Sequence, residues 1–537
     1  MSAKLFPVSV TAEAALENFA LGTPNQSTSY KSAPDRTASF FGRALYDYKN
    51  RYYATLTVRA DGSTKFAPGK QWGYFPAGSI AWRISNEKWM KPIKFISDLK
   101  LRASYGLAGN NRIGNDLWHN IYRVYSGTSA PAFGNEEYNY YQFADQTYLY
   151  DPDLKWETTI TRNIGLDFGF FRNRLSGTVD VYWNTTKDLL VPSIIPNSSG
   201  YSRQMTNVGQ TSNKGVEISL DAKIIQTKDF QLSANFNVAF NKNKVDKLAT
   251  GETEWKTKAS LSNWYGTYNY KMEVGKSMGL IYGFVNDGFY KVDDFDFDAT
   301  TKKWTLKPGI PDNSSFSSGN FAFKPGAMKF KKLSDSESNL ITEDDMTVIG
   351  DTNPKVTGGF GLSGNWKNLD FTAFFNYMCD FDVLNVNKLY LHSAVRRNYS
   401  NLSTDMNLAN RFRYVDDAGV NVSSDPVALA ALNENAKTYS WMSVTQGITM
   451  TDLVEDGSFL RLSTLTVGYT LPKHWLRSLG VKSLRLYFSG SNLFTITGYS
   501  GYDPEVNIQK GLTPGIDNNV TPRSLSLIHI SEPTRLR

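Results

Sequence analysis

The chain has 537 residues, of which 41% are hydrophobic and 14% aromatic. Its one cysteine, Cys379, excludes an intrachain disulfide and a thiolate metal cage. No run of about eighteen apolar residues is present, so a transmembrane helix is excluded. The net charge of +7 comes from basic residues scattered among 51 acidic ones, and we therefore expect no nucleic-acid-binding face.

Residues 1–40 follow no regular pattern and are expected to be an irregular segment. The first hairpin is expected over residues 41–59, because every second residue of 52–58 is apolar after a polar turn. An Asp-Gly pair at 61–62 predicts the next turn. Two further strands are expected at 80–84 and 99–107.

Two long hairpins follow. Residues 164–170 and 175–183 alternate between apolar and polar side chains on either side of a four-residue turn. A segment rich in proline, serine, glycine and asparagine (191–212) separates them from a second pair of alternating segments, 216–223 and 230–240. This period of two gives each strand one apolar face and one wetted face.

The rest of the chain mixes loops with strands. Residues 293–351 are polar, acidic and interrupted by glycine and proline, so we expect one long loop or a small inserted lobe. Residues 385–455 are also polar, and 427–435 have the Ala/Leu character of a short helix. Further strands are expected at 268–290, 360–377, 465–471 and 484–488. In all, we expect roughly fourteen to eighteen strands.

Long alternating strands with short turns at one end and long polar loops at the other are typical of a transmembrane β-barrel. Lipid would lie outside such a barrel and water inside, because a bilayer tolerates no unpaired sheet edge. Aromatic residues near the strand ends would form an interfacial girdle: Trp156, Phe170, Phe171, Tyr182 and Trp183. The expected fold class is therefore all-β, a large antiparallel transmembrane β-barrel with long extracellular loops. A soluble β-sandwich or propeller also alternates and is the alternative fold.

The sequence motifs predict no catalytic residue and no cofactor. Residues 359–364 (GFGLSG) match the dinucleotide-binding pattern, but no helix pattern follows them and they alternate as a strand does. Gly275-Lys276-Ser277 lacks the first glycine of a phosphate-binding loop. We therefore expect that the protein is not an enzyme.

No metal site is predicted either. The four histidines lack zinc-ligand spacing: His119, His392, His474 and His529. The run Glu343-Asp344-Asp345 could bind a hard cation, but a solvated acidic loop is the preferred interpretation. The pattern also leaves the substrate-binding residues unknown.

Many short segments resemble the TonB-dependent outer-membrane transporters of the SusC/RagA type. The resemblance covers about 41–524 and depends on the order and spacing of the segments together. They are RY (51–52), RADGSTKF (59–66), WG and FP (72–76), LKLRASYG (99–106), WE (156–157), GLD (165–167), NVG (207–209), NKGVE (213–217), FLRL (459–462), GYTLP (468–472), NLF (492–494) and DPE (503–505).

The resemblance implies a wide barrel of about twenty-two strands around an N-terminal plug, which imports oligosaccharides or, in some members, peptides. It also implies a SusD-like surface lipoprotein as a lid, and energy from an inner-membrane complex through TonB. A metal-binding type of loop in this family would fall at 334–345. Here Ser336, Ser338 and Asn339 take its central positions, so a calcium ion is not expected.

The sequence has no plug, TonB box or signal-peptide pattern. We therefore expect residues 41–524 to be the C-terminal portion of the barrel, an incomplete fragment with two unpaired sheet edges. Residues 525–537 resemble a translated sequencing adapter and are expected to be a non-native tail.

The expected function is active import of large polar solutes across the outer membrane, with oligosaccharides or other glycans as the preferred substrate and peptides as the other possibility. The expected partners are a SusD-like lipoprotein, the TonB complex and outer-membrane lipid. Contacts with the lid or the substrate are expected in loops 108–150 and 385–455. The alternative is a secreted soluble β-rich carbohydrate-binding protein or a surface adhesin.

Overall fold

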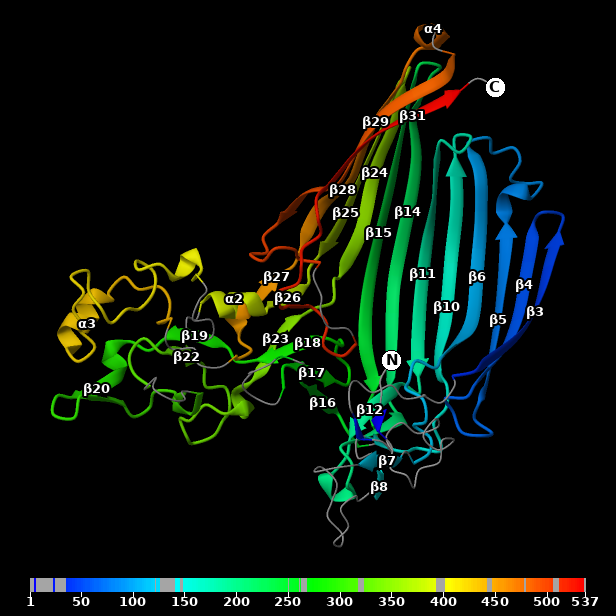
Figure 1. Ribbon diagram of the computed structural model, residues 1–537. Coiled ribbons are helices and arrows are strands. Elements are labelled where there is room, and N and C mark those ends of the chain that lie inside the picture. Colours follow the sequence, from blue (N-terminus) through cyan, green and yellow to red (C-terminus); the bar gives the residue numbers. More distant parts are fainter. Residues whose placement is uncertain are drawn as a thin grey trace.

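The computed structural model describes residues 4–5, 23–24, 35–120, 122–125, 141–144, 148–249, 251–259, 261, 268–316, 323–392, 401–441, 447–477, 480–505 and 511–535. Its main feature is one curved antiparallel sheet, the wall (Figure 1). In spatial order, the strands of the wall are β3 (Thr37–Tyr48), β4 (Tyr52–Ser63), β5 (Trp72–Arg83), β6 (Ile96–Asn110), β10 (Glu157–Phe170), β11 (Leu175–Lys187), β14 (Gln210–Gln226), β15 (Phe230–Lys247), β24 (Val356–Trp366), β25 (Leu369–Cys379), β28 (Phe459–Thr470), β29 (Val481–Thr497) and β31 (Ser526–Arg535).

Within the described residues, the wall holds 13 strands and is open, with β3 and β31 at its edges. This number is just below the expected range, because the alternating residues of 268–290 form short strands outside the wall. The last strand, β31, pairs with β29 from Ser491↔Ser526 to Val481↔Arg535. It lies in the segment expected to be a non-native tail, and that origin stays a prediction.

The connections of the wall divide into a short-turn end and a long-loop end. The expected turns at 171–174, 227–229 and 367–368 each join consecutive wall strands. In the turn between β3 and β4, Lys49 and Asn50 have φ of 54° and 52°, the positive values that mirror-image hairpin turns require. The Asp-Gly pair at 61–62 lies inside β4, and the turn follows it. At the short-turn end, α4 (Lys473–Leu476) caps the connection from β28 to β29.

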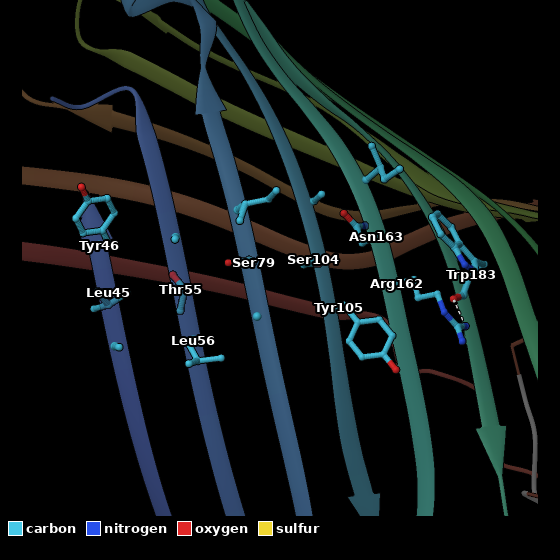
Figure 2. Close-up of a pocket in the computed structure, with 16 residues that line it drawn as sticks. Leu45, Tyr46, Thr55, Leu56, Ser79, Ser104, Tyr105, Arg162, Asn163 and Trp183 are labelled. Atoms are coloured by element: carbon cyan, nitrogen blue, oxygen red, sulfur yellow. Dashed lines mark hydrogen bonds between the residues drawn. The ribbon is translucent and has the colours of Figure 1, made fainter. Parts of the chain in front are cut away.

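The two faces of the wall differ in polarity. On one face the register aligns Ile80, Ala103, Ile164 and Val181 across four strands. The three large side chains among them are exposed, Ile80 at 66%, Ile164 at 47% and Val181 at 43%, and Figure 2 shows part of this apolar face with Leu56 and Tyr105. A soluble β-sandwich would bury such a face against a second sheet. The structure therefore favours the membrane barrel over the soluble fold.

The largest buried apolar cluster lies outside the wall, in what we call the loop lobe (251–355, 380–458 and 511–517). Its fully buried side chains include Tyr270, Ile281, Leu384 and Ile516. The elements of the loop lobe are β16 (Glu254–Thr257), β17 (Tyr270–Glu273), β18 (Leu280–Gly283), β19 (Asn286–Phe289), β20 (Phe295–Asp298), β21 (Lys303–Leu306), β22 (Met328–Phe330), β23 (Thr347–Asp351), β26 (Asp382–Asn385), β27 (Val454–Asp456), β30 (Ile516–Asp517), α2 (Val386–Leu391) and α3 (Pro426–Leu432).

A smaller cluster joins the other long loops. Phe66, Ile113, Leu117 and Leu154 are buried together there. The expected loop at 191–212 contains a hairpin, because β12 (Leu190–Ile194) pairs with β13 (Arg203–Asn207). The remaining short strands are β1 (Lys4–Leu5), β2 (Thr23–Pro24), β7 (Tyr122–Tyr125), β8 (Tyr141–Ala144) and β9 (Tyr148–Leu149). No helix in the described part of the chain is both long and apolar enough to span a membrane.

Exposed aromatic side chains gather at the short-turn end: Trp89, Phe95, Phe171, Trp366 and Trp475. Phe95 stacks on Phe170 with ring centroids 6.2 Å apart. An aromatic girdle at this end agrees with the sequence expectation. Trp156 and Tyr182 are exceptions. Trp156 packs on Phe66, and the Tyr182 hydroxyl donates to Asn241 on the polar face.

The exposed apolar face predicts an asymmetric response to charge on β14. We expect Leu220→Lys, on the apolar face, to lower the free energy of unfolding by about 2–4 kcal/mol, because the ammonium would lie in hydrocarbon. Ser219→Lys, one residue away on the polar face, is the matched control and should change it by less than about 0.5 kcal/mol. Denaturant unfolding in lipid vesicles measures both. Equal effects would contradict the assignment of the faces.

Candidate functional site

The polar face of the wall carries a network of ion pairs. The Arg102 guanidinium lies 2.7 Å from Asp167 and 3.1 Å from Asp180, and Lys100 lies 3.4 Å from Asp167. Gly165 leaves room for the Arg102 and Asp180 side chains, since a Cβ at this position would lie 2.4 Å from the Asp180 carboxylate and 2.6 Å from the Arg102 guanidinium. These charges lie together on the polar face of the wall and neutralise one another.

The same arrangement recurs on strands β25, β28 and β29. Arg485 lies 2.5 Å from Asp370, and Gly468 between them again leaves the space, because a Cβ there would lie 2.4 Å from the guanidinium. Neutral hydrogen-bonding pairs complete the polar face, including Thr159 with Thr186 and Thr466 with Ser489, each at 3.0 Å. The inner surface is therefore wettable, and many of its charges are already paired.

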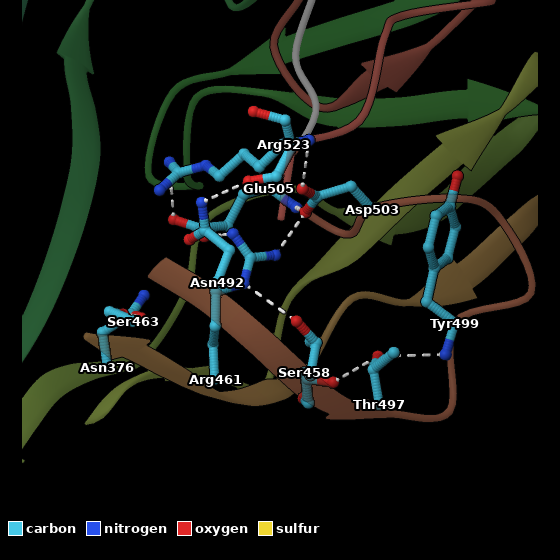
Figure 3. Close-up of polar contacts among 12 residues, drawn as sticks. Asn376, Ser458, Arg461, Ser463, Asn492, Thr497, Tyr499, Asp503, Glu505 and Arg523 are labelled. Carbon is cyan, nitrogen blue, oxygen red and sulfur yellow. Dashed lines mark hydrogen bonds and ion pairs between the residues drawn. The ribbon is translucent and has the colours of Figure 1, made fainter. Parts of the chain in front are cut away.

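A buried cation ties the wall to the segment after β29 (Figure 3). The Arg461 side chain is 2% exposed and lies 2.6 Å from Asp503 and 2.5 Å from Glu505. Its Nε donates to Thr495 Oγ1 at 2.9 Å. Glu505 also pairs with Arg523 at 3.2 Å. Since Ile516, soon after, enters the core of the loop lobe, this cluster helps to fix the lobe at the mouth of the wall.

The two loops that are expected to contact the lid or the substrate are both partly buried. In the 108–150 loop, Ile113 and Leu117 pack into the smaller cluster, while residues 121, 126–140 and 145–147 lie outside the described residues. In the 385–455 loop, Leu389 and Leu429 are fully buried. The expected short helix is confirmed as α3, with Asp425 as its N-cap. Part of each loop is therefore structural core.

A lysine that precedes the 334–345 loop donates to oxygen atoms of that loop. The Lys332 ammonium donates to Ser334 Oγ at 2.7 Å, to the Leu340 carbonyl at 3.0 Å and to the Asp345 carboxylate at 3.1 Å. Asp345 is the one acidic side chain fully buried there, and no group of three or more His, Cys, Asp or Glu side chains among the described residues could hold a metal. The residues present therefore do not fit the calcium that the family loop implies.

Asp345 was expected to belong to a solvated acidic loop, and that interpretation is wrong for this residue. Burial raises its pKa, but backbone N–H groups of Ser334, Thr342 and Leu333 and the Lys332 ammonium outweigh burial and lower the pKa to about 2. The carboxylate also caps the short helix Glu343–Asp345 through Thr342. Asp345 thus holds together the two ends of the 334–345 loop through its hydrogen bonds.

His392 is a second buried ionisable group of the loop lobe. Its Nε2 lies 3.0 Å from Asp405 and its Nδ1 lies 3.3 Å from the Tyr439 hydroxyl. Burial lowers the pKa of His392 below its ordinary value, although the hydrogen bond to Asp405 opposes that shift. His119 lies 3.9 Å from Asp116, and the His474 ring packs against Trp475, so these two histidines have other neighbours.

Sequence reasoning alone missed these clusters, although the signal was present. Arg102 and Asp167 belong to the LKLRASYG and GLD segments, and Arg461 belongs to FLRL, whose partners Asp503 and Glu505 belong to DPE. Each is a charge inside or beside an alternating apolar strand. The spatial pairing of such charges requires the register of the sheet, which the sequence pattern does not give.

A curved antiparallel wall with an exposed apolar face, a polar inner face and long loops at one end defines a membrane β-barrel protein. Comparisons with known proteins agree with this class. The chain matches the family described as TonB dependent receptor-like, beta-barrel over residues 11–493. It belongs to this family, which is one of outer-membrane transporters and receptors, and the expected SusC/RagA type and outer-membrane location are confirmed.

Individual relatives give the same result. The chain is 32% identical to TonB-dependent receptor P3 of Formosa agariphila, over 95% of this chain and 45% of that protein. It is 30% identical to TonB-dependent receptor SusC of Bacteroides thetaiotaomicron, over 91% of this chain and 43% of that protein. A solved structure of the RagAB peptide transporter matches with a TM-score of 0.69 and 26% identity, over 95% of this chain and 50% of that chain. The chain thus spans about half the length of the curated relatives it matches.

Removing the Arg461 guanidinium should weaken the attachment of the loop lobe. We expect Arg461→Met to lower the free energy of unfolding by about 3–5 kcal/mol, because it leaves two carboxylates without their buried cation. Arg485→Met is the matched control, and its half-exposed pair should cost only about 1 kcal/mol. Denaturant unfolding followed by tryptophan fluorescence measures the difference, and equal costs would contradict the role of Arg461.

The 334–345 loop should be stable without a bound metal ion. We expect a chelator to leave the unfolding temperature of the loop lobe unchanged, because the Lys332 ammonium already satisfies the loop oxygens. Lys332→Met should lower the free energy of unfolding by about 2 kcal/mol, as Asp345 loses a charged donor. A fall in unfolding temperature with chelator that calcium reverses would show that the loop binds metal.

His392 should make the loop lobe sensitive to acid. Because its folded-state pKa is lowered, the unfolded chain takes up the proton first as the pH falls below about 6.5, and stability is lost in that window. The free energy of unfolding should fall faster for the wild type than for His392→Gln, by up to about 1.4 kcal/mol per pH unit. Parallel pH profiles from thermal unfolding between pH 7 and pH 5 would contradict this assignment.

Proposed function

We propose that this chain forms part of the barrel wall and the loop lobe of a TonB-dependent importer, which moves large polar solutes across the outer membrane. The polar inner face of the wall is the observation that carries the proposal. The ion pairs around Arg102 and Arg485 make this face hydrophilic, and each of these two arginines has a carboxylate partner. Passage along such a surface requires no bond breaking, so we propose a transporter and not an enzyme.

We further propose that the solutes are oligosaccharides. Hydroxyl and amide groups line the inner face, such as Thr159, Tyr182 and Asn241, and they suit the hydroxyl groups of an uncharged glycan. A peptide would bring charged termini and side chains, whereas the inner arginines already have their carboxylates. The RagAB relative is a peptide transporter, so peptides are the second candidate solute.

The proposal includes two partners. A SusD-like surface lipoprotein would lie over the loop lobe as a lid, and the TonB complex would supply energy from the inner membrane. Exposed valines support the lid contact. Val427 belongs to α3, at the far end of the lobe (Figure 1), and is 81% exposed, while Val415 and Val420, which precede α3 in the sequence, are 45% and 56% exposed.

An uptake experiment tests the proposed function. Cells that lack the gene should lose uptake of fluorescent oligosaccharides of a matched size series, and the complementing gene should restore it. Uptake should also stop in a tonB mutant or after addition of an uncoupler. The lid partner should co-purify with the receptor from detergent-solubilised membranes.

The controls separate the parts of the proposal. Labelled peptides of equal mass should enter equally with and without the gene. Gene-dependent uptake of peptides in place of oligosaccharides would overturn the solute class but keep the transporter. If neither solute shows gene-dependent uptake, or if uptake continues after the uncoupler is added, the proposal of active import is overturned.

A further inference from the structure

Three basic side chains lie on the apolar outer face of the wall, near its long-loop end. Arg162 shares that face with Ile164 because both are even-numbered residues of β10. On the next strands, Trp183 of β11 is opposite Lys214 of β14, and Lys214 is opposite Lys242 of β15. We call Arg162, Lys214 and Lys242 the basic row.

The height of the basic row places it at the outer edge of the membrane. Arg162 is eight residues from Phe170 at the short-turn girdle, which corresponds to roughly 20 Å along the membrane normal for a strand tilted by about 40°. The apolar band of an outer-membrane barrel is about 25 Å tall. Tyr105 and Trp183 beside Arg162 are exposed aromatic residues, as expected of an interfacial belt.

The basic row has no internal counter-charge. Within the described residues, none of its three side chains forms an ion pair. Arg162 donates to Thr185 Oγ1 at 3.2 Å and lies over the Tyr105 ring at 5.9 Å. Lys214 and Lys242 face each other directly across two strands, and like charges in that position destabilise a sheet. An anion between them would remove that cost.

The nearby charges do not supply this anion. Lys355 lies close by, but it pairs with Asp380 at 2.7 Å. Asp351 forms no ion pair with Lys214 or Lys242 within the described residues, and its carboxylate accepts from the backbone N–H and the side-chain amide of Asn353. An anion bound from outside would balance both lysines.

An apolar groove adjoins the basic row. It has a volume of about 790 Å³ and runs over the small residues Ala54, Gly78 and Ala103, with Arg162 and Tyr105 at its edge (Figure 2). Trp183 also lines this groove. Cations at the membrane interface above an apolar groove match a molecule with an anionic headgroup and hydrocarbon chains.

We propose that the basic row binds the phosphate groups of a phosphorylated lipid of the outer leaflet, whose acyl chains lie along the apolar groove. The headgroup supplies the missing anion between Lys214 and Lys242 and a second contact at Arg162. Trp183 and Tyr105 lie at the boundary between headgroup and chains. The site is on the lipid side of the wall and is separate from the solute path.

Native mass spectrometry of the complete, detergent-purified gene product tests the site. The probe is diphosphorylated lipid A, compared with the same lipid after removal of its phosphates. We expect the phosphorylated form to bind at least tenfold more tightly. The triple variant Arg162→Gln, Lys214→Gln, Lys242→Gln should weaken its binding at least tenfold, whereas binding of the dephosphorylated lipid should not change.

Lys223→Gln is the matched control, because Lys223 lies on β14 with Lys214 but faces the inside near the short-turn end. It should bind lipid as the wild type does. Heat-dependent gel migration confirms that each variant is a folded barrel. The proposal is overturned if the folded triple variant keeps wild-type affinity, if Lys223→Gln weakens binding equally, or if inorganic phosphate alone displaces the lipid.

Discussion

The structure depends on the requirement that every backbone N–H and C=O group in hydrocarbon has a partner within the protein. The antiparallel ladders between β3 and β31 meet this requirement for every strand that lies between these two edges. Because the ladders use the backbone, the side chains are left to divide by face: Ile80, Ile164 and Val181 outside, Arg102, Asp167 and Asp180 inside. A single sheet thus separates a surface that faces lipid from a surface that faces water, and the wall itself has no hydrophobic core.

The hydrophobic core that a soluble protein would have lies instead in the loop lobe. Tyr270, Leu384 and Ile516 come from three long connections and are fully buried together. Ion pairs between the wall and these connections then set the position of the lobe, above all the contacts of Arg461 with Asp503 and Glu505. The wall therefore ends in a firmly placed lobe, as the proposed import of a large solute and the proposed lid contact would both require.

Much of the wall was predictable from the sequence, because a period of two is visible in residues such as 216–223 and 230–240 and fixes both strand and face. The turns at 171–174 and 367–368 were predictable for the same reason. The loop lobe was not, since its strands are two to five residues long and its core joins segments far apart in sequence. The contact between Lys332 and Asp345 was not predictable either, because nothing in the sequence pattern indicates that the ammonium and the carboxylate lie together. The basic row likewise needs the register of three strands.

The alternation of water and lipid along one strand is the most direct test of this account. Single cysteines at residues 216–221 of β14, in a Cys379→Ser background, would be treated with a membrane-impermeant maleimide in lipid vesicles. The account predicts labelling at 217, 219 and 221 and protection at 216, 218 and 220. Labelling without a period of two, or with the opposite phase, would contradict the assignment of the two faces.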